Sequence, residues 1–340
     1  MTSEALKAVT ERRNIANAAT NRKHKLRAVV FGANGLAGKA ICRKFKDMNF
    51  DVYEITHDMC NAALYGQVCN VFARLHMTPD IVVNCIAYSS VDLKSNEEAN
   101  KSYFANVIAP YNIGTACIQF KVPLLIHIST DYVFNSHDGI KIREDCQRYS
   151  PSNVYGQHKL DADMSLVGIY DNWNFRNEDD PLKLRIVRTS SLYGPDRNTF
   201  VDYVVDEYLK NGTIKALYSG SSVPTSTRHL AEFIYHLSIL TLDAKEDILN
   251  HSRYFKNCVC SSGMENISRY MFAGHIVGFL HDMHIPGSLT IERARDCDFT
   301  ALRPIYSTLE PSAIGEPPPD WYEELKDYLY KKLDKMGLLR

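Results

Sequence analysis

Three side chains that could exchange a proton with a substrate occur within residues 124–159, namely Thr130, Tyr155 and Lys159. Residues 124–128 form an apolar run with the length and composition of a buried parallel strand, which places Thr130 at the strand's carboxyl end. Tyr155 and Lys159 are four residues apart, so on a helix they project from one face. The three groups can therefore converge at the sheet edge where open α/β folds bind ligands. Such a set is suited to general acid catalysis, in which the phenol gives up a proton.

The segment that carries Tyr155 has the signals of a helix start. Ser150 can cap this helix, and Pro151 suits its first turn. The Tyr-x-x-x-Lys spacing alone is common, and residues 322–332 contain two further copies of it. Those copies lie in a charged C-terminal segment that follows no buried strand, so we interpret them as solvated surface residues.

A glycine-rich turn near the start of the chain predicts a dinucleotide site. A strand at residues 27–31 runs into Gly32-Ala-Asn-Gly-Leu-Ala-Gly38 and then into a helix at residues 39–48. Glycines in such a turn allow backbone N–H groups to approach a pyrophosphate and allow helix and strand to pack closely. The alternative is a glycine turn that serves packing alone. The cofactor contacts expected from this turn are Gly32, Asn34, Gly35, Leu36 and Gly38.

Later segments supply further expected cofactor contacts. A second strand, residues 51–55, is followed by Thr56-His57-Asp58 without an Arg or Lys that would bind the 2′-phosphate of NADP. This tilts the prediction toward NAD, although a later loop can supply a cation. A buried strand that begins at Ile81 ends in small residues, and Asn106 is expected either to brace the backbone near the site or to be an ordinary helix residue. The remaining expected contacts are Asp58, Ala87, Tyr88, Asn106, Tyr155, Lys159 and Thr189.

The alternation of strands and helices predicts an α/β fold with a doubly wound parallel sheet (Rossmann) and a smaller C-terminal substrate lobe. Residues 1–25 are polar and are expected to form an N-terminal tail. The dinucleotide-binding domain is expected to span residues 26–194, with a returning segment at about 223–260. The smaller lobe is expected to take residues 195–222 and 261–340, including a last amphipathic helix.

Composition excludes several classes of protein. The 340 residues carry a net charge of −1, so the chain lacks the basic footprint of nucleic-acid or anionic-membrane binding. We find no apolar run of transmembrane length and no secretory signal. The nine cysteines are scattered and contain no C-x-x-C pair, which argues against metal sites and disulfides and favours a reducing compartment, the cytoplasm.

Seven motifs of the chain match a known pattern. They are Gly32-Ala-Asn-Gly-Leu-Ala-Gly38, Asn84-Cys-Ile-Ala-Tyr-Ser-Ser-Val-Asp92, Ile128-Ser-Thr-Asp-Tyr-Val-Phe134, Pro151-Ser-Asn-Val-Tyr-Gly156 with Lys159, Arg188-Thr-Ser190, Pro224-Thr225, and Arg303-Pro with Ser307 and Leu309. In these residues the chain resembles the extended short-chain dehydrogenase/reductases over about residues 26–310. Within them it is most similar to the dTDP-4-dehydrorhamnose reductases and to their relative, the regulatory beta subunit of methionine adenosyltransferase.

The resemblance implies an NAD(P)H-dependent oxidoreductase of dTDP-rhamnose biosynthesis that reduces a 4-keto-6-deoxy nucleotide sugar. Tyr155 would give its proton to the C4 carbonyl, to which Thr130 would hydrogen-bond. Lys159 would hold the nicotinamide ribose and bias Tyr155 toward its anion, because an ammonium about 4 Å away contributes up to roughly 4 kcal/mol at an effective dielectric of about 20. Further substrate contacts are expected at Asp131, Tyr132, Val133 and Arg303.

The substrate half departs from this pattern, so alternatives stay open. The Trp that usually follows Arg-Thr-Ser is Ser191, and the usual Asp-Gln-x-Gly before Pro-Thr is Ser219-Gly-Ser-Ser222. One alternative is a cofactor-binding regulatory subunit without catalysis, and another is a nucleotide-sugar epimerase or a reductase of an unrelated carbonyl. The expected partners are a nucleotide-sugar substrate and a second copy in a homodimer, or a methionine adenosyltransferase catalytic chain under the regulatory alternative.

Overall fold

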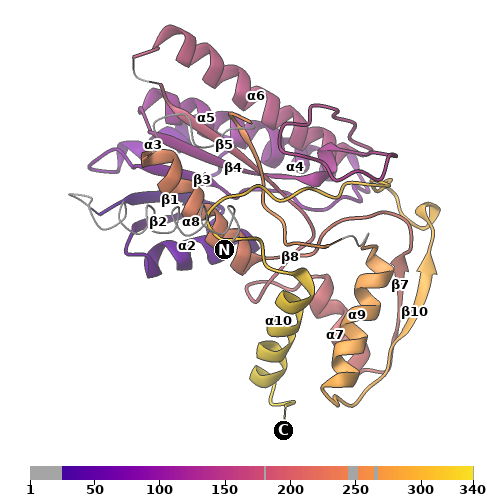
Figure 1. Cartoon of the computed structure of the whole chain (residues 1–340). Helices are drawn as coiled ribbons and strands as arrows, with labels where there is room; N and C mark the ends of the chain where they lie inside the picture. The colour runs from indigo at the N-terminus through magenta and orange to yellow at the C-terminus, as the bar shows by residue number, and fades with distance from the viewer. Residues whose placement is uncertain (1–24, 180, 244–251, 264–266, 340) are drawn as a thin grey trace, which may run out of the picture.

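A parallel sheet forms the centre of the computed structural model, which describes residues 25–179, 181–243, 252–263 and 267–339 (Figure 1). The sheet has the strand order β2-β1-β3-β4-β5-β9. Its strands are β1 (Arg27–Phe31), β2 (Asp51–Ile55), β3 (Ile81–Asn84), β4 (Leu124–Thr130), β5 (Lys183–Thr189) and β9 (Phe255–Asn257). The order reverses between β1 and β3, which opens a crevice at their carboxyl ends. The predicted doubly wound parallel sheet is confirmed, whereas the expected tail lies outside the described residues except for Lys25.

Helices cover both faces of the sheet. They are α2 (Leu36–Asp47) and α8 (Thr227–Asp243) on one face, and α3 (Tyr65–Ala73), α5 (Ala109–Gln119) and α6 (Val154–Arg176) on the other (Figure 1). Side chains of a strand alternate between faces, and β1 shows the consequence. Val30 packs into the cluster with α2 and α8, whereas Val29 and Phe31 pack into the cluster with α3 and α5. The apolar run in β1 is therefore buried on both faces, as parallel strands require.

The start of α6 differs from the expected one. Asn153, and not Ser150, caps the helix, because the Asn153 side chain accepts a hydrogen bond from the backbone N–H of Gly156 at 2.8 Å. Ser150 instead donates its backbone N–H to the carbonyl of Val133 at 3.0 Å and so connects the incoming loop to the short segment that follows β4. The helix begins at Val154, so Tyr155 lies in its first turn and Lys159 in its second. Tyr155 and Lys159 therefore still project from one face of the helix, as predicted.

The connection from β3 to α5 contains a helix that changes its winding. It runs as α4 (Asn96–Tyr103), then as a π-helical segment (Phe104–Ile108), and then directly into α5. Such segments are rare and are often found near functional sites. Asn106 lies within the π-helical segment, and its side chain is fully buried.

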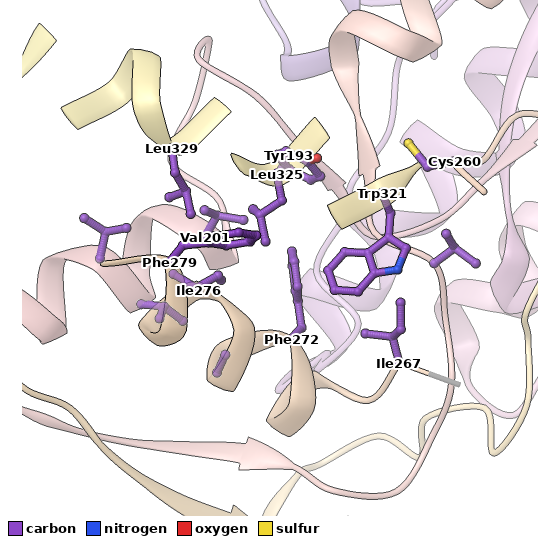
Figure 2. Packing of buried hydrophobic residues seen from close by; sticks show 14 of the residues in the cluster. Tyr193, Val201, Cys260, Ile267, Phe272, Ile276, Phe279, Trp321, Leu325 and Leu329 are labelled. Atoms are coloured by element: carbon purple, nitrogen blue, oxygen red, sulfur yellow. The ribbon is translucent and has the colours of Figure 1, made fainter. Parts of the chain in front are cut away.

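A third apolar cluster joins the C-terminal elements. These elements are α7 (Phe200–Leu209), β7 (Thr213–Leu217), α9 (Arg269–Asp282), β10 (Thr290–Ala294) and α10 (Trp321–Lys335). The short segments β6 (Leu192–Tyr193), η2 (Asp131–Val133), β8 (Thr225–Ser226) and η4 (Asp296–Asp298) complete the described regular structure. Figure 2 shows Trp321 and Leu325 of α10 facing Phe272 of α9, and the rings of Trp321 and Phe272 are 6.1 Å apart. The division of the chain into two domains stays a prediction.

The interpretation of residues 322–332 as solvated surface is wrong for one of its two pairs. The Tyr328 hydroxyl donates to the Asp202 carboxylate at 3.0 Å, and the Lys332 ammonium pairs with the same carboxylate at 2.8 Å. Sequence spacing alone missed this because Asp202 lies on α7, more than a hundred residues away. No helix in the described part of the chain is long and apolar enough to cross a membrane.

Candidate active site

A cavity of about 480 Å³ lies at the carboxyl edge of the sheet. The start of α2, the ends of β4 and β5, the loop after β3 and the first turns of α6 all contribute to its wall. The predicted site residues that line it are Gly35, Leu36, Ala87, Thr130, Asp131, Tyr132, Tyr155, Lys159 and Thr189. The glycine turn and the proton-handling set therefore meet at one place, although they are about a hundred residues apart in the sequence.

The glycines of the turn have different tasks. Gly32 has a φ of +73°, and a Cβ there would lie 2.9 Å from the backbone of Cys85. A Cβ at Gly38 would lie 2.2 Å from the carbonyl oxygen of Gly32. These two glycines thus serve close packing, and neither of them lines the cavity. Gly35 does line it, with only 3.1 Å between an added Cβ and the Gly32 oxygen.

The start of α2 suits a phosphate group. Gly35 is the N-cap residue, and no side chain caps the first turn. The N–H groups at a helix start lack intrahelical partners, and the helix dipole favours an anion there. The helix also begins at Leu36, three residues earlier than predicted, because it follows the glycine turn without an intervening loop. On the far wall, the buried hydroxyl of Thr189 has no hydrogen-bond partner among the described residues. The residues present therefore fit a dinucleotide.

Tyr155 presents a protonated phenol to the cavity. Its hydroxyl is hydrogen-bonded to Thr130, and its ring packs edge-on against Tyr132 at 5.8 Å. Burial raises the pKa of Tyr155 above its usual value, and the hydrogen bond with Thr130 offsets only part of this rise. At neutral pH the group therefore keeps its proton and is able to donate it.

The expected lowering of the Tyr155 pKa by Lys159 is not found. The Lys159 ammonium donates to the carbonyl of Ile128 at 2.7 Å, and it lies 3.2 Å from Nε2 of His127. Both partners belong to β4, so the charge faces the sheet as well as the cavity. Burial in turn lowers the pKa of Lys159 to about 8. Desolvation, which the sequence does not reveal, outweighs the attraction that we estimated for two groups in isolation.

Asp131 connects three segments and does not offer a free charge to a substrate. Its carboxylate accepts hydrogen bonds from Thr130 Oγ1 at 3.2 Å, Ser190 Oγ at 3.1 Å and Ser307 Oγ at 2.6 Å. These hydroxyls come from β4, from the residue after β5 and from the C-terminal segment. Burial raises the pKa of Asp131 to about 6, since the three hydrogen bonds compensate desolvation only in part.

Several predicted residues lie outside the cavity lining. They are Gly32, Asn34, Gly38, Asp58, Tyr88, Asn106, Val133 and Arg303. The Asn106 side chain makes two hydrogen bonds with the backbone of Tyr88. Its carbonyl oxygen accepts the N–H of Tyr88 at 3.0 Å, and its amide nitrogen donates to the carbonyl of Tyr88 at 2.9 Å. Val133 is fully buried in the third apolar cluster. Arg303 forms a two-pronged ion pair with Asp92. Asn106 thus braces the loop after β3, and Arg303 is engaged by the protein itself.

The sequence analysis missed two cations that line the cavity, Arg197 and Arg269. Arg269 is the first residue of α9, and its guanidinium lies 4.9 Å from the ring centre of Phe200. Both arginines come from the C-terminal half of the chain, where no motif marks them. Ser191, which replaces the usual Trp, also lines the cavity and lies 2.8 Å from the hydroxyl of Ser222. The departure from the family pattern therefore alters the cavity wall directly.

A larger cavity of about 790 Å³ lies between α2, α8 and α10. Neither Tyr155 nor the glycine turn lines it. Most of its charged groups are already paired within the protein, as in the two hydrogen bonds between Arg43 and Asp196 at 3.2 and 2.8 Å. The cavity at the sheet edge is thus the candidate active site, although it is the smaller of the two.

Comparisons with known proteins agree with this geometry. The sequence model described as "RmlD substrate binding domain" matches residues 26–333. The spore coat polysaccharide biosynthesis protein SpsK of Bacillus subtilis is 28% identical over 310 residues, which are 90% of this chain and 98% of that protein. The dTDP-4-dehydrorhamnose reductase of Mycolicibacterium smegmatis is 28% identical over 205 residues, which are 60% of this chain and 58% of that protein.

Solved structures share the fold. The dTDP-4-dehydrorhamnose reductase of Bacillus anthracis, determined in complex with NADP, superposes with a TM-score of 0.74 at 23% identity and covers 91% of this chain and 100% of its own. The corresponding protein of Clostridium acetobutylicum gives a TM-score of 0.74 at 25% identity, covering 90% and 99%. The fold of this chain is thus one already known among dTDP-4-dehydrorhamnose reductases.

Proposed function

The chain belongs to the RmlD substrate binding domain family, and from this premise we propose that it is an NAD(P)H-dependent reductase of a 4-keto-6-deoxy nucleotide sugar, like the dTDP-4-dehydrorhamnose reductases. The observation that carries the proposal is the meeting of Thr130, Tyr155 and Lys159 with the glycine turn in one cavity. Each group has a place in the reduction of a carbonyl, which needs a hydride, a proton and a group that orients the oxygen.

The start of α2 is proposed to hold the cofactor. Backbone N–H groups next to Gly35 would bind its pyrophosphate, Ala87 would allow it to pass the end of β3, and Lys159 would bind the nicotinamide ribose. A nicotinamide cofactor supplies a hydride when it is bound. Residues 56–58 contain no cation that could bind the 2′-phosphate of NADPH. The assay below therefore compares NADH with NADPH.

Tyr155 is proposed as the general acid. Its phenol is protonated at neutral pH and faces the cavity, so its proton can pass to the carbonyl oxygen as the carbonyl carbon is reduced. The hydroxyl of Thr130 hydrogen-bonds to the phenol, and its one hydrogen faces the Asp131 carboxylate. When substrate binds, this hydrogen would turn to the carbonyl oxygen and orient that oxygen next to the phenol proton.

The two arginines missed by the sequence analysis are proposed to bind the nucleotide diphosphate. Arg269 and Arg197 line the cavity, and guanidinium groups are well suited to phosphate oxygens. Ser191 leaves room that a Trp would fill, so we expect a substrate whose sugar or nucleotide is larger than, or differently placed from, that of the usual branch. The roles of Tyr132 as a substrate contact and of Asn34 and Asp58 as cofactor contacts stay predictions.

The regulatory alternative predicts cofactor binding without turnover. The presence of Thr130, Tyr155 and Lys159 together in the cavity favours a catalyst, because a regulatory chain has no need of a protonated phenol there. An epimerase would need the same residues but would return the substrate in the same oxidation state. We also expect the protein to work in the cytoplasm, since all nine of its cysteines are unpaired thiols.

A coupled panel assay tests the proposal. Oxidation of NADH and of NADPH is followed with dTDP-, UDP- and GDP-linked 4-keto-6-deoxy sugars, with the matching sugars that lack the ketone as controls. We expect oxidation with at least one keto sugar and a product reduced at C4. Cofactor binding without oxidation of any keto sugar would contradict the proposal, and a pull-down of a methionine adenosyltransferase catalytic chain would then support the regulatory alternative.

A further inference from the structure

A buried polar cluster lies behind Lys159, on the side away from the cavity. Its members come from three elements: Asn84 ends β3, His127 lies in β4, and Asp163 lies one helical turn after Lys159 on α6. The side chains of His127 and Asp163 are fully buried, and Lys159 is 1% exposed. The role proposed above for Lys159 uses none of these three residues, yet His127 contacts its ammonium, Asp163 acts on its charge, and Asn84 holds His127.

The hydrogen bonds of Asn84 fix the tautomer of His127. The Asn84 carbonyl oxygen accepts the backbone N–H of Ile86 at 3.0 Å, so the amide nitrogen must face the other way. That nitrogen lies 3.0 Å from Nδ1 of His127 and has only hydrogens to offer. Nδ1 is therefore the acceptor. Burial lowers the pKa of His127 well below its usual value, so the ring is neutral and carries its one hydrogen on Nε2.

The Nε2 hydrogen of His127 faces the ammonium of Lys159, which cannot accept it. Nε2 lies 3.2 Å from the nitrogen of Lys159, and an ammonium has no lone pair with which to accept a hydrogen bond. A neutral amine would accept it. The fixed ring of His127 thus favours the uncharged form of Lys159, as does burial itself.

Asp163 acts in the opposite sense. One carboxylate oxygen accepts the hydroxyl of Ser129 at 2.7 Å, and the other is buried without a hydrogen-bond partner in the described chain, 3.7 Å from Nε2 of His127. A buried carboxylate stabilises a cation nearby, and Asp163 raises the pKa of Lys159. The unpartnered oxygen also attracts the Nε2 hydrogen of His127 away from Lys159.

We propose that His127 and Asp163 are positioning residues that act through Lys159 in opposite directions: Asp163 holds its nitrogen as an ammonium at the cavity wall, and His127 favours the neutral amine. The proposal rests on the proposed function for its catalytic consequence, because only the ammonium would bind the ribose as described above. Loss of the proton of Lys159 would then set the alkaline limit of activity.

Other ionisable groups face this cluster and are constant in the test. Cys85 lies next to Lys159, but burial raises the pKa of its thiol, which stays neutral. Arg188 of β5 faces Asp163 and favours its carboxylate form. The phenols of Tyr149 and Tyr155 also lie near Asp163 and keep their protons, because burial raises the pKa of both. None of these groups reverses the direction expected for a change at His127 or Asp163.

The test measures the charge of Lys159 without cofactor or substrate. Lysine labelled at the side chain with ¹⁵N and ¹³C is titrated by NMR in the wild-type protein, in His127→Gln and in Asp163→Asn. Asp163→Asn should lower the pKa of Lys159 by about one unit or more, since an opposite charge is lost. His127→Gln should raise it, because Gln reaches the position of Nε2 and is free to present its carbonyl oxygen to the ammonium.

Two further variants separate this role from a general loss of packing. Asp163→Glu retains the charge and should restore most of the wild-type titration. Tyr170→Phe removes from the same helix a buried hydroxyl that has no hydrogen-bond partner among the described residues, so it should leave the titration unchanged. Shifts of the same sign in His127→Gln and Asp163→Asn, or no shift in either, would overturn the proposal. If Asp163→Asn does not fold, the sign in His127→Gln alone decides.

The kinetic arm follows the alkaline limb of kcat/KM. This limb should move to lower pH in Asp163→Asn and to higher pH in His127→Gln, each by the same number of units as the NMR titration. Opposite NMR shifts in a protein that reduces no keto sugar would uphold the cluster and reject the proposed function. If the protein turns over a keto sugar but the alkaline fall of kcat/KM stays at the same pH in both variants, the proposed function would be upheld and the role of the cluster rejected.

Discussion

At the scale of single residues, the proposed chemistry depends on a phenol that keeps its proton until a carbonyl oxygen takes it. Burial places the pKa of Tyr155 above its usual value, and the hydrogen bond with Thr130 aligns the donor. A tyrosine held in this way is a poor base and a ready acid once charge develops on the neighbouring oxygen. The phenol would therefore contribute to the reduction step and not to cofactor binding.

Replacing Tyr155 by Phe tests this separation. We expect kcat to fall by about 10²–10⁴-fold, the usual contribution of a general acid, while the dissociation constant of NADPH changes less than about threefold. Stopped-flow turnover and a fluorescence titration of the cofactor measure the two quantities. Tyr170→Phe is the matched control, as it removes a buried phenol outside the cavity. Turnover that survives in Tyr155→Phe would show that another group donates the proton.

A second prediction at this scale concerns Asp131 and pH. Its pKa is about 6 in the folded protein against 3.8 for the free group, so the unfolded chain loses its proton first as the pH rises. Asp131 therefore lowers the free energy of unfolding by on the order of 3 kcal/mol between about pH 4 and pH 7. Asp131→Asn cannot titrate, so its stability relative to the wild type should increase over that interval.

Urea unfolding at several pH values measures this difference. Other buried acids, such as Asp163, are present in both proteins and cancel in the comparison. Parallel stability curves for the wild type and Asp131→Asn would show that the three hydroxyl donors keep the carboxylate ionised in spite of burial.

At the scale of elements, different glycines of the turn serve helix packing and cofactor binding, although the sequence pattern does not distinguish them. A Cβ at Gly38 would meet the backbone of Gly32 at 2.2 Å, so helix and strand would have to move apart. Gly35 has ordinary φ and ψ angles and lies at the cavity, where a side chain would fill the space needed by a pyrophosphate. Packing and binding thus fall on different glycines of one motif.

Paired variants test this division. Gly38→Ala should lower the free energy of unfolding by about 1–3 kcal/mol, the usual cost of overpacking. Gly35→Val should weaken NADPH binding by at least about tenfold with a smaller loss of stability. Thermal unfolding and cofactor titration are measured on both proteins. Equal losses of stability and affinity in the two variants would mean that the turn acts as one unit.

The sequence predicted elements that depend on local patterns. The strand before Gly32 and the helix with Tyr155 follow from runs of apolar residues and from turn chemistry, and both are present. It did not predict the Asn153 cap, because Ser150 before Pro151 and Asn153 both have residue types suited to capping, and only the fold shows that Ser150 bonds to Val133 in the preceding loop. Nor did it predict the π-helical segment around Asn106, which has no distinguishing pattern in the residue types.

The site was predictable where one motif carries it and unpredictable where distant segments meet. The strand end with Thr130 and the helix with Tyr155 belong to one continuous stretch, so their convergence follows from the fold class. Arg269 reaches the cavity from α9, whose position depends on the packing of the third apolar cluster. Desolvation is equally invisible in a sequence, which is why the direction of the Tyr155 pKa was missed.

At the scale of the whole molecule, polar links join the C-terminal segment to the rest of the protein, and two of them lie close to the cavity. Ser307 donates to Asp131 at the end of β4, and Arg303 pairs with Asp92 in the loop after β3. Ser89 and Val91 of that same loop line the cavity. The C-terminal segment therefore fixes part of the wall next to which the sugar would bind, although Arg303 itself does not line the cavity.

Arg303→Met tests whether this link shapes the substrate site. Met keeps much of the apolar side chain but loses the ion pair, so KM for the keto sugar should rise several-fold while the affinity for NADPH stays within about twofold. The loss of stability should be only about 1 kcal/mol, because both partners are partly exposed to solvent.

The pair lowers the pKa of Asp92 to about 2 from its usual 3.8. Its stabilising effect is therefore present above about pH 4 and disappears as the pH falls toward 2, so wild type and variant should converge in stability at low pH. Convergence without a change in KM would mean that the link holds the two parts together but leaves the cavity wall unaffected.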